Sequence, residues 1–154
     1  MDIKGWRAYG VVVLRVAIGL GLAYHGASTL FGRGGMAGFA KYVGSLGFPF
    51  HHAPAFWAYC AKLSEFAGGI LLVLGGLTRP AALLIVITMS VAAFVANGKH
   101  PVFAPPREPS KEMSLLYLVC ALTLFFTGPG PLALDPWLKG LWAGWKRKQR
   151  EAKK

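Results

Sequence analysis

Four apolar segments, separated by stretches rich in glycine, proline and charge, dominate the pattern of the chain. They cover roughly residues 9–30, 55–76, 80–97 and 112–128. Each is apolar around its whole circumference and approaches the roughly 17–25 residues that a helix needs to cross a bilayer. None alternates as a barrel strand would, and helices satisfy their own backbone in lipid. The pattern predicts an all-α membrane protein with a four-transmembrane-helix bundle over residues 1–136. A soluble helical bundle with a large core is the weaker alternative.

The segments between the spans carry clear turn signals. The sequence GGLTRPAA at 75–82 predicts a tight turn in which glycine ends one helix and Pro80 opens the next. The loop at 97–112 holds four prolines, which predicts an irregular outer connection. The first outer loop differs, because apolar residues recur in it at helical spacing and predict a short amphipathic helix on the outer membrane face. These residues are Met36, Phe39, Ala40, Val43 and Leu46.

Residues 137–154 are predicted to form an amphipathic, basic, cytoplasmic tail. Its aromatic positions share one side of a helix, and a basic run follows them. The residues expected to anchor the tail on a lipid surface are Trp137, Trp142, Trp145, Lys146, Arg147 and Lys148. Tryptophan favours the headgroup level, and lysine and arginine are attracted to anionic cytoplasmic lipid. A nucleic-acid-binding tail is the competing interpretation of such a charge run. The tryptophans favour the bilayer, so we expect no nucleic-acid partner.

Composition supports the membrane class and limits the chemistry. Hydrophobic residues make up 55% of the 154 residues and charged residues only 15%, with a net charge of +11; soluble domains usually contain about 25% charged residues. Cys60 and Cys120 fall within predicted spans without a CxxC motif, so we expect buried free thiols. His51, His52 and His100 show no spacing typical of a metal site, and we predict no metal.

The distribution of basic residues predicts the orientation. Of the 17 lysines and arginines, ten lie on the side of the two termini, five on the opposite side and two within spans. The positive-inside rule therefore places both termini in the cytoplasm. The first apolar run is too long for a signal peptide and is expected to be retained as the first helix. We expect a multi-pass protein of a cell membrane, either an inner or a plasma membrane.

Three charged residues lie well inside the predicted spans, where an unpaired charge costs a few kcal/mol. Arg15 shares a face of the first span with Gly19 and Gly26, and Glu65 shares a face of the second span with Lys62. Small residues on such faces allow close helix approach. We therefore expect a buried ion-pair network of Arg15, Lys62 and Glu65, with Arg15 as the counter-charge of Glu65 and Lys62 as a competing partner. The network either locks two helices together or serves a buried polar site open to the outer side.

Further polar residues are predicted in the outer half of the membrane. Together with the buried glutamate they form the candidate ligand-binding set: His25, Glu65, Asn97, His100, Glu112 and Tyr117. Their shared depth is the main functional signal in the chain. A histidine near a span end is more often an interfacial hydrogen-bonding group than a ligand, so the set carries more weight than any one member.

Four stretches of the chain resemble the DoxX family of four-span membrane proteins. They are LRVAIGLGLAYHG at 14–26, LGFP at 46–49, SEFAGGILLVLGGLTRPAA at 64–82 and GPGPLALD at 128–135. The third is the most specific, while the residue before LD in the fourth is less polar than is usual in the family. The resemblance implies the four-helix fold and marks Arg15, His25 and Glu65 as motif residues. It implies an activity only loosely. Family members include a membrane subunit of an archaeal thiosulfate:quinone oxidoreductase and proteins linked to thiol and oxidative-stress systems, and distant relatives act as chaperones or cargo receptors.

The function expected from this resemblance is that of an accessory integral-membrane subunit of a bacterial membrane redox complex. A quinone is the candidate ligand, and no other cofactor is implied. The expected partners are the lipid bilayer, other membrane or redox subunits, and a second copy of the chain. The alternative is a non-catalytic membrane scaffold, assembly factor or chaperone that docks a partner protein. A transporter is disfavoured, because four short spans without an inverted repeat suit alternating access poorly.

Overall fold

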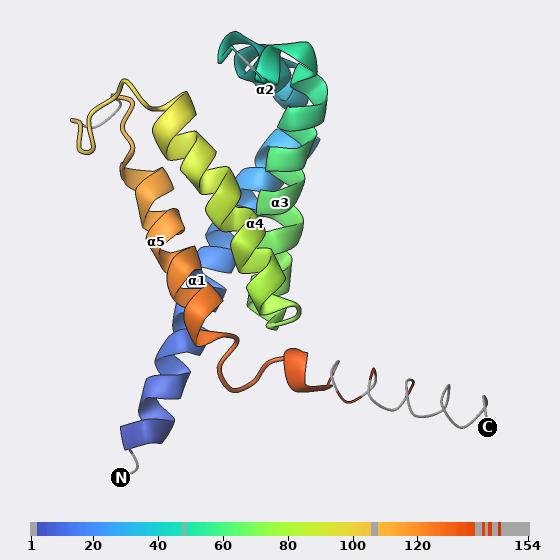
Figure 1. Ribbon diagram of the computed structural model, residues 1–154, viewed down its shortest axis with the longest axis vertical. Coiled ribbons are helices and arrows are strands. Elements are labelled where there is room, and N and C mark those ends of the chain that lie inside the picture. The colour runs from blue at the N-terminus through green and yellow to red at the C-terminus, as the bar shows by residue number, and fades with distance from the viewer. Residues whose placement is uncertain are drawn as a thin grey trace.

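A computed structural model describes residues 3–47, 49–105 and 108–137 together with positions 140, 142 and 145. The elements are α1 (Ile3–Phe31), α2 (Gly35–Ser45), the 3-10 helix η1 (Phe50–His52), α3 (Pro54–Leu74), α4 (Thr78–Val91), the π-helical segment η2 (Ala92–Ala96) and α5 (Glu112–Thr127). All regular secondary structure in this described part is helical. In Figure 1, α2 lies at one end of the bundle, and the start of α1 and the segment after α5 lie at the other. We call these the α2 end and the tail end.

The four predicted apolar segments correspond to α1, α3, α4 together with η2, and α5, although α1 begins at Ile3, ahead of the first predicted segment. Three helices are long and apolar enough to cross a membrane: Ala8–Phe31, Pro54–Leu74 and Thr78–Ala96. The fourth, α5, is also apolar but has 16 residues. A helix of that length measures about 24 Å, against a hydrocarbon core of about 30 Å. The described chain thus has three full-length candidate spans and one shorter apolar helix, and α2 lies where a helix was predicted in the first outer loop.

Glycine allows α1 and α3 to pack backbone against backbone. A Cβ atom built on Gly69 would lie 2.6 Å from both Ala23 N and Gly19 O, and one built on Gly26 would lie 2.6 Å from Phe66 N. Backbone atoms of a packed helix cannot move aside for a side chain, so these positions accept only glycine. The predicted small-residue face of the first span is therefore the surface on which α3 packs.

The hydrophobic core lies where α4 and α5 close against α1 and α3. The helix α4 packs along both α3 and α5, and Figure 1 shows it between them. Fully buried side chains at the centre come from all four helices: Leu22, Leu72, Ile85 and Leu124. Large apolar side chains also cover the outside, for example Leu20, Ile87 and Val119. An exterior with many large apolar side chains is typical of a protein surrounded by lipid rather than water.

The turn between α3 and α4 is joined to the segment that follows α5. Gly75 ends α3 in the left-handed conformation, with φ 66°. Asp135 accepts hydrogen bonds from the backbone N–H groups of Leu77 (2.5 Å) and Thr78 (3.1 Å), and its own N–H donates to the carbonyl of Gly75 at 3.0 Å. A carboxylate placed at the N-terminus of a helix satisfies free N–H groups and complements the helix dipole. The sequences GGLTRPAA and GPGPLALD therefore fold as one unit.

Arg15 belongs to this cluster at the tail end, and its predicted pairing with Glu65 is wrong. The residue is only 2% exposed and donates from Nη2 to the carbonyl of Leu132, three residues before Asp135. A Cβ atom on Gly75 would overlap the guanidinium. Glu65 lies ten residues before Gly75 on α3, about 15 Å along the helix axis. Arg15 therefore fastens α1 to the α3–α4 turn and to the segment after α5.

The chain remains helical where the tail is described. Residues 135–137, 140, 142 and 145 are helical, and Trp137, Trp142 and Trp145 each expose more than half of their surface. The basic anchoring residues that were predicted next to them lie outside the described residues; they are Lys146, Arg147 and Lys148. The three tryptophans of the predicted anchor are therefore exposed at the surface.

Candidate functional site

The central polar feature of the bundle is an ion pair between neighbouring turns of α3. Lys62 Nζ lies 3.0 Å from Glu65 Oε1 and 2.7 Å from Glu65 Oε2, and the two side chains are 13% and 8% exposed. Their i,i+3 spacing places them on one helix face. Phe39 of α2 covers the ammonium group, with its ring centroid 4.6 Å from Nζ. Each charge is compensated locally, which explains how both persist within an apolar segment.

A cavity of about 340 Å³ between α2, α3 and α4 reaches this pair. We call it the first cavity. Its aromatic wall includes Phe39, Tyr42, Phe50 and Trp57. Its polar groups include Lys62, Glu65, Thr88 and Asn97. An apolar lining with a few convergent polar groups is typical of small-molecule sites.

A second cavity of about 180 Å³ reaches the same pair from the side of α1 and α5. It is bounded by residues of α1, α3, α4, η2 and α5. Its hydrogen-bonding side chains are His25, Lys62, Glu65, Ser114 and Tyr117. Lys62 and Glu65 therefore supply the charged groups that the two cavities share.

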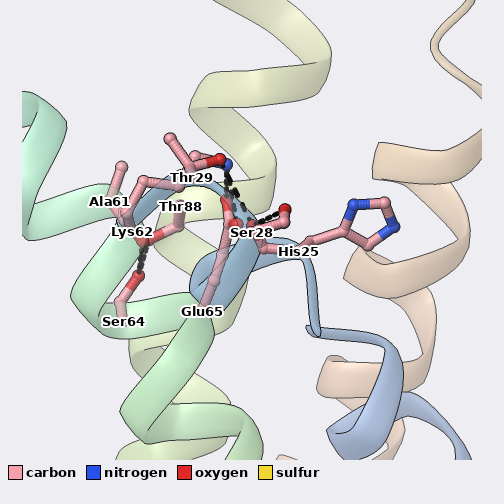
Figure 2. A network of polar contacts seen from close by, with 8 residues as sticks. All are labelled: His25, Ser28, Thr29, Ala61, Lys62, Ser64, Glu65 and Thr88. Carbon is pink, nitrogen blue, oxygen red and sulfur yellow. Dashed lines mark hydrogen bonds and ion pairs between the residues drawn. The ribbon is translucent and has the colours of Figure 1, made fainter. Parts of the chain in front are cut away.

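His25 and Tyr117 face each other across the second cavity from α1 and α5. Their rings make an edge contact, with centroids 6.2 Å apart and planes at 80°. The hydroxyl group of Tyr117 lies against α1 at Gly21, where a Cβ atom would overlap it. Figure 2 shows the imidazole of His25 pointing away from Lys62 and Glu65 and towards α5. The histidine therefore borders the cavity without contacting the ion pair directly.

The predicted site residues divide between several places. Five of them line the two cavities: His25, Lys62, Glu65, Asn97 and Tyr117. His100 and Glu112 line neither cavity, and Arg15 lies at the tail end. Residues that the sequence placed at one depth of the membrane therefore do not all belong to one site, because residues at the same depth can face different sides of a helix.

One prediction about the cysteines was wrong. Cys60 and Cys120 are free, but Cys60 is exposed and Cys120 is only partly buried, and Cys60 lines neither cavity. The thiol of Cys60 therefore faces the surroundings of the bundle.

The histidines expected to bind no metal lie close together in part: the rings of His51 and His52 are 3.9 Å apart. Within the described ranges, no group of three histidine, cysteine, aspartate or glutamate side chains could hold a metal ion.

Two hydrogen bonds made by side chains of α2 and α4 were not predicted from the sequence. Ser64 Oγ and Thr88 Oγ1 lie 2.7 Å apart and join α3 to α4 (Figure 2), and Tyr42 OH donates to the carbonyl of Ala96 at 3.3 Å. The π-helical segment η2 was not predicted either, because no sequence pattern indicates it. Such π-helical turns often occur at functional sites. Its first residue, Ala92, lines both cavities. Hydroxyl groups within apolar runs were the available signal, since they need partners in lipid.

Comparison with known proteins agrees with the motifs and the helices. The DoxX family profile matches residues 10–98, which include the ion pair, most of the cavity walls and the α3–α4 turn. An uncharacterized protein of Haemophilus influenzae is 39% identical over 77 residues, which are 49% of this chain and 57% of that protein. The similarity thus spans little more than half of the relative. No solved structure matches the chain. Because the family profile covers more than half of its residues and its helices have membrane-spanning length, this chain belongs to the DoxX family of membrane proteins.

Proposed function

We propose that this DoxX protein is an accessory integral-membrane subunit of a redox complex and that its first cavity binds a quinone. The observation that carries the proposal is the first cavity, which has aromatic walls and ends on a lysine–glutamate pair within apolar helices. The redox assignment rests on the resemblance to a family that includes a subunit of a quinone oxidoreductase. The binding assignment rests on the chemistry of the cavity wall.

The residues of the first cavity suit a quinone, which is a planar apolar ring with two carbonyl oxygens. Its volume of about 340 Å³ lies within the roughly 300–1,000 Å³ of ligand pockets. Lys62 has three N–H groups, and two hydrogen bonds to Glu65 leave one for a ligand. The amide group of Asn97 is a second donor, and Phe39 and Trp57 offer ring faces for stacking.

The chain supplies binding and electrostatics, and a bound quinone would supply the electron-accepting chemistry. Lys62 donates a hydrogen bond to a carbonyl oxygen, and its positive charge favours electron density at that oxygen. Glu65 holds the ammonium group in place and keeps the site neutral overall. Electrons come from a partner protein or a soluble reductant, which is why the proposed role is that of an accessory subunit.

The proposed orientation places the tail end in the cytoplasm and the α2 end outside an inner or plasma membrane. The excess of basic residues on the side of the two termini supports it. In this orientation both cavities lie in the outer half of the bilayer, and α2 covers the first cavity from the outer face. A redox partner or a second copy of the chain would then contact the apolar exterior.

A short-chain quinone is expected to quench the fluorescence of Trp57, which lines the first cavity. The measurement uses a variant in which the other four tryptophans are phenylalanine, in lipid nanodiscs, with decylubiquinone as the probe. We expect saturable quenching. Lys62→Met should weaken the affinity about tenfold, because a hydrogen bond from a charged group contributes about 1.5–3 kcal/mol.

Two further variants control this test. His100→Ala should bind the probe normally, since His100 lines neither cavity. Lys62→Met/Glu65→Gln removes both charges and should bind as weakly as the single variant. Quenching that rises without saturation, or that is unchanged in Lys62→Met, would contradict the proposal. A partner protein that co-purifies with a chain unable to bind quinone would favour the alternative role of scaffold, assembly factor or chaperone.

We also propose that the tail anchors on anionic lipid through its exposed tryptophans and the basic run after them. In a variant with phenylalanine at Trp6 and Trp57, only Trp137, Trp142 and Trp145 fluoresce. Their emission should move to shorter wavelength in nanodiscs with anionic lipid compared with zwitterionic lipid. High salt should reverse the change, because it screens surface charge. Identical spectra in both lipids would argue against a charge-dependent anchor.

A further inference from the structure

Two cavities of different character meet at one ion pair. The first is walled mainly by aromatic and aliphatic side chains, whereas the second adds the imidazole of His25 and the hydroxyl groups of Ser114 and Tyr117. Lys62 and Glu65 line both cavities, so the pair forms part of the partition between them. An ion pair in this position can contact a ligand on one side and water on the other.

The second cavity has the size and the polar groups that bound water requires. Its volume of about 180 Å³ is far above the roughly 10–15 Å³ that one water molecule requires, and its five hydrogen-bonding side chains offer the partners that buried water needs. His25 is exposed. Met113 and Ser114, which also line this cavity, belong to the first turn of α5. That turn follows the loop at the α2 end (Figure 1), so this part of the cavity wall lies near the α2 end.

We propose that the second cavity is a water-filled vestibule through which the Lys62–Glu65 pair exchanges protons with the aqueous phase at the α2 end. This inference rests on the proposed function for its use, because it assigns the side from which protons reach a ligand in the first cavity. The other titratable side chains lining the cavities are Tyr42 from α2, His25 from α1 and Tyr117 from α5. The residues of α4 and η2 that line them are not titratable.

The proposed proton transfers return Lys62 and Glu65 to the protonation states in which they began. Electrons that an electron-donating partner protein delivers to a ligand oxygen in the first cavity create a need for a proton at that oxygen. Lys62 Nζ gives one, so that an N–H bond breaks and an O–H bond forms. The carboxylate of Glu65 then accepts a proton from hydronium in the second cavity, which leaves water, and passes this proton to the neutral amine of Lys62, so the ammonium–carboxylate pair is restored. One proton thus passes from the α2 end to the ligand for each electron delivered.

Proton exchange at Lys62 can be measured without a quinone. In full-length protein labelled with ¹⁵N-lysine and placed in nanodiscs, NMR follows the exchange of Nζ protons with water, and Lys62→Gln identifies the signal by its loss. Ser114→Trp fills the second cavity and is expected to slow exchange about tenfold, because the indole displaces the water that carries protons. Val91→Trp is the matched control, since Val91 lines the first cavity alone, and its rate should stay close to that of the unchanged protein.

The outcomes separate the two cavities. Slow exchange in Val91→Trp together with normal exchange in Ser114→Trp would assign water access to the first cavity and overturn the inference. Equal rates in both variants and the unchanged protein would overturn it as well. Circular dichroism and the remaining lysine signals show whether each variant is folded.

A second measurement covers the case in which the bulky variants do not fold. Ser114→Cys in a Cys60→Ala/Cys120→Ala background should react with a charged, membrane-impermeant thiol reagent in sealed vesicles. It should react from the same side as Lys41→Cys on α2, and the modification should slow exchange at Lys62. Reaction from the opposite side, or from neither side, overturns the inference. Because none of these measurements needs a quinone, failure of quinone binding and failure of the vestibule are distinguishable.

Discussion

A single methyl group added at Gly69 is expected to disrupt the packing of α1 against α3 and to lower the free energy of unfolding by about 3 kcal/mol, as overpacking of a close contact does. The added Cβ would lie 2.6 Å from Ala23 N and from Gly19 O. Both are backbone atoms within a helix, so the two helices must separate along their length. Gly69→Ala should therefore unfold at a lower temperature in detergent, as followed by circular dichroism.

Gly10→Ala is the matched control for this effect. Gly10 also lies in α1, but a Cβ atom there would meet nothing within 4 Å. Alanine has the higher helix propensity, by about 1 kcal/mol, so this variant should be neutral or slightly more stable. The same chemical change is thus expected to have opposite signs at two positions. A similar loss of stability in both variants would show that the α1–α3 contact is not the cause.

Asp135→Asn is expected to lower the free energy of unfolding by about 2–3 kcal/mol, because hydrogen bonds to a charged acceptor contribute about 1.5–3 kcal/mol. The carboxylate accepts hydrogen bonds from Leu77 and Thr78 at the start of α4. It also lies three residues after Leu132, whose carbonyl accepts a hydrogen bond from the buried guanidinium of Arg15. An amide in its place keeps the shape but removes the negative charge. Thermal unfolding in detergent and proteolysis of the α3–α4 turn should both report the change.

A double-mutant cycle tests whether Arg15 and Asp135 act together. If they do, Arg15→Met/Asp135→Asn should cost less than the sum of the two single variants, by about 0.5–3 kcal/mol. Glu108→Gln provides the control, because it removes a carboxylate from an exposed loop position and should change stability by less than about 0.5 kcal/mol. Strict additivity of the two changes would contradict the cluster at the tail end.

The helices and their packing faces could be predicted because both are local properties of the chain. Apolar runs between turn signals predicted α1, α3, α4 with η2, and α5. Gly19 and Gly26 predicted the face of α1 that meets α3, because glycine at this spacing marks a flat helix surface wherever the partner lies. The short helix α2 followed from the same periodicity within a loop. None of these predictions required knowledge of which segments are neighbours in space.

The partners of the charged residues could not be predicted in the same way. Arg15 and Glu65 carry opposite charges on helices that do pack together, yet they lie at different heights of the bundle. Asp135 is 120 positions after Arg15, and only the return of the chain after α5 brings it to the α3–α4 turn. Lys62, named as the competing partner from its spacing, is the residue that pairs with Glu65. Spacing within one helix was a reliable guide, whereas depth compared between helices was not.

The amino-acid sequence by itself determined the membrane class, the apolar helices, the glycine face of α1 and the polar residue types available inside the bundle. It did so because hydrophobicity and helical period act over a few turns. The tertiary structure alone decided that Arg15 serves the tail end, that His25 turns towards Tyr117, and that one ion pair separates two cavities. Those features depend on the axial offset and rotation of whole helices against one another, which are set by the sum of many contacts between distant segments.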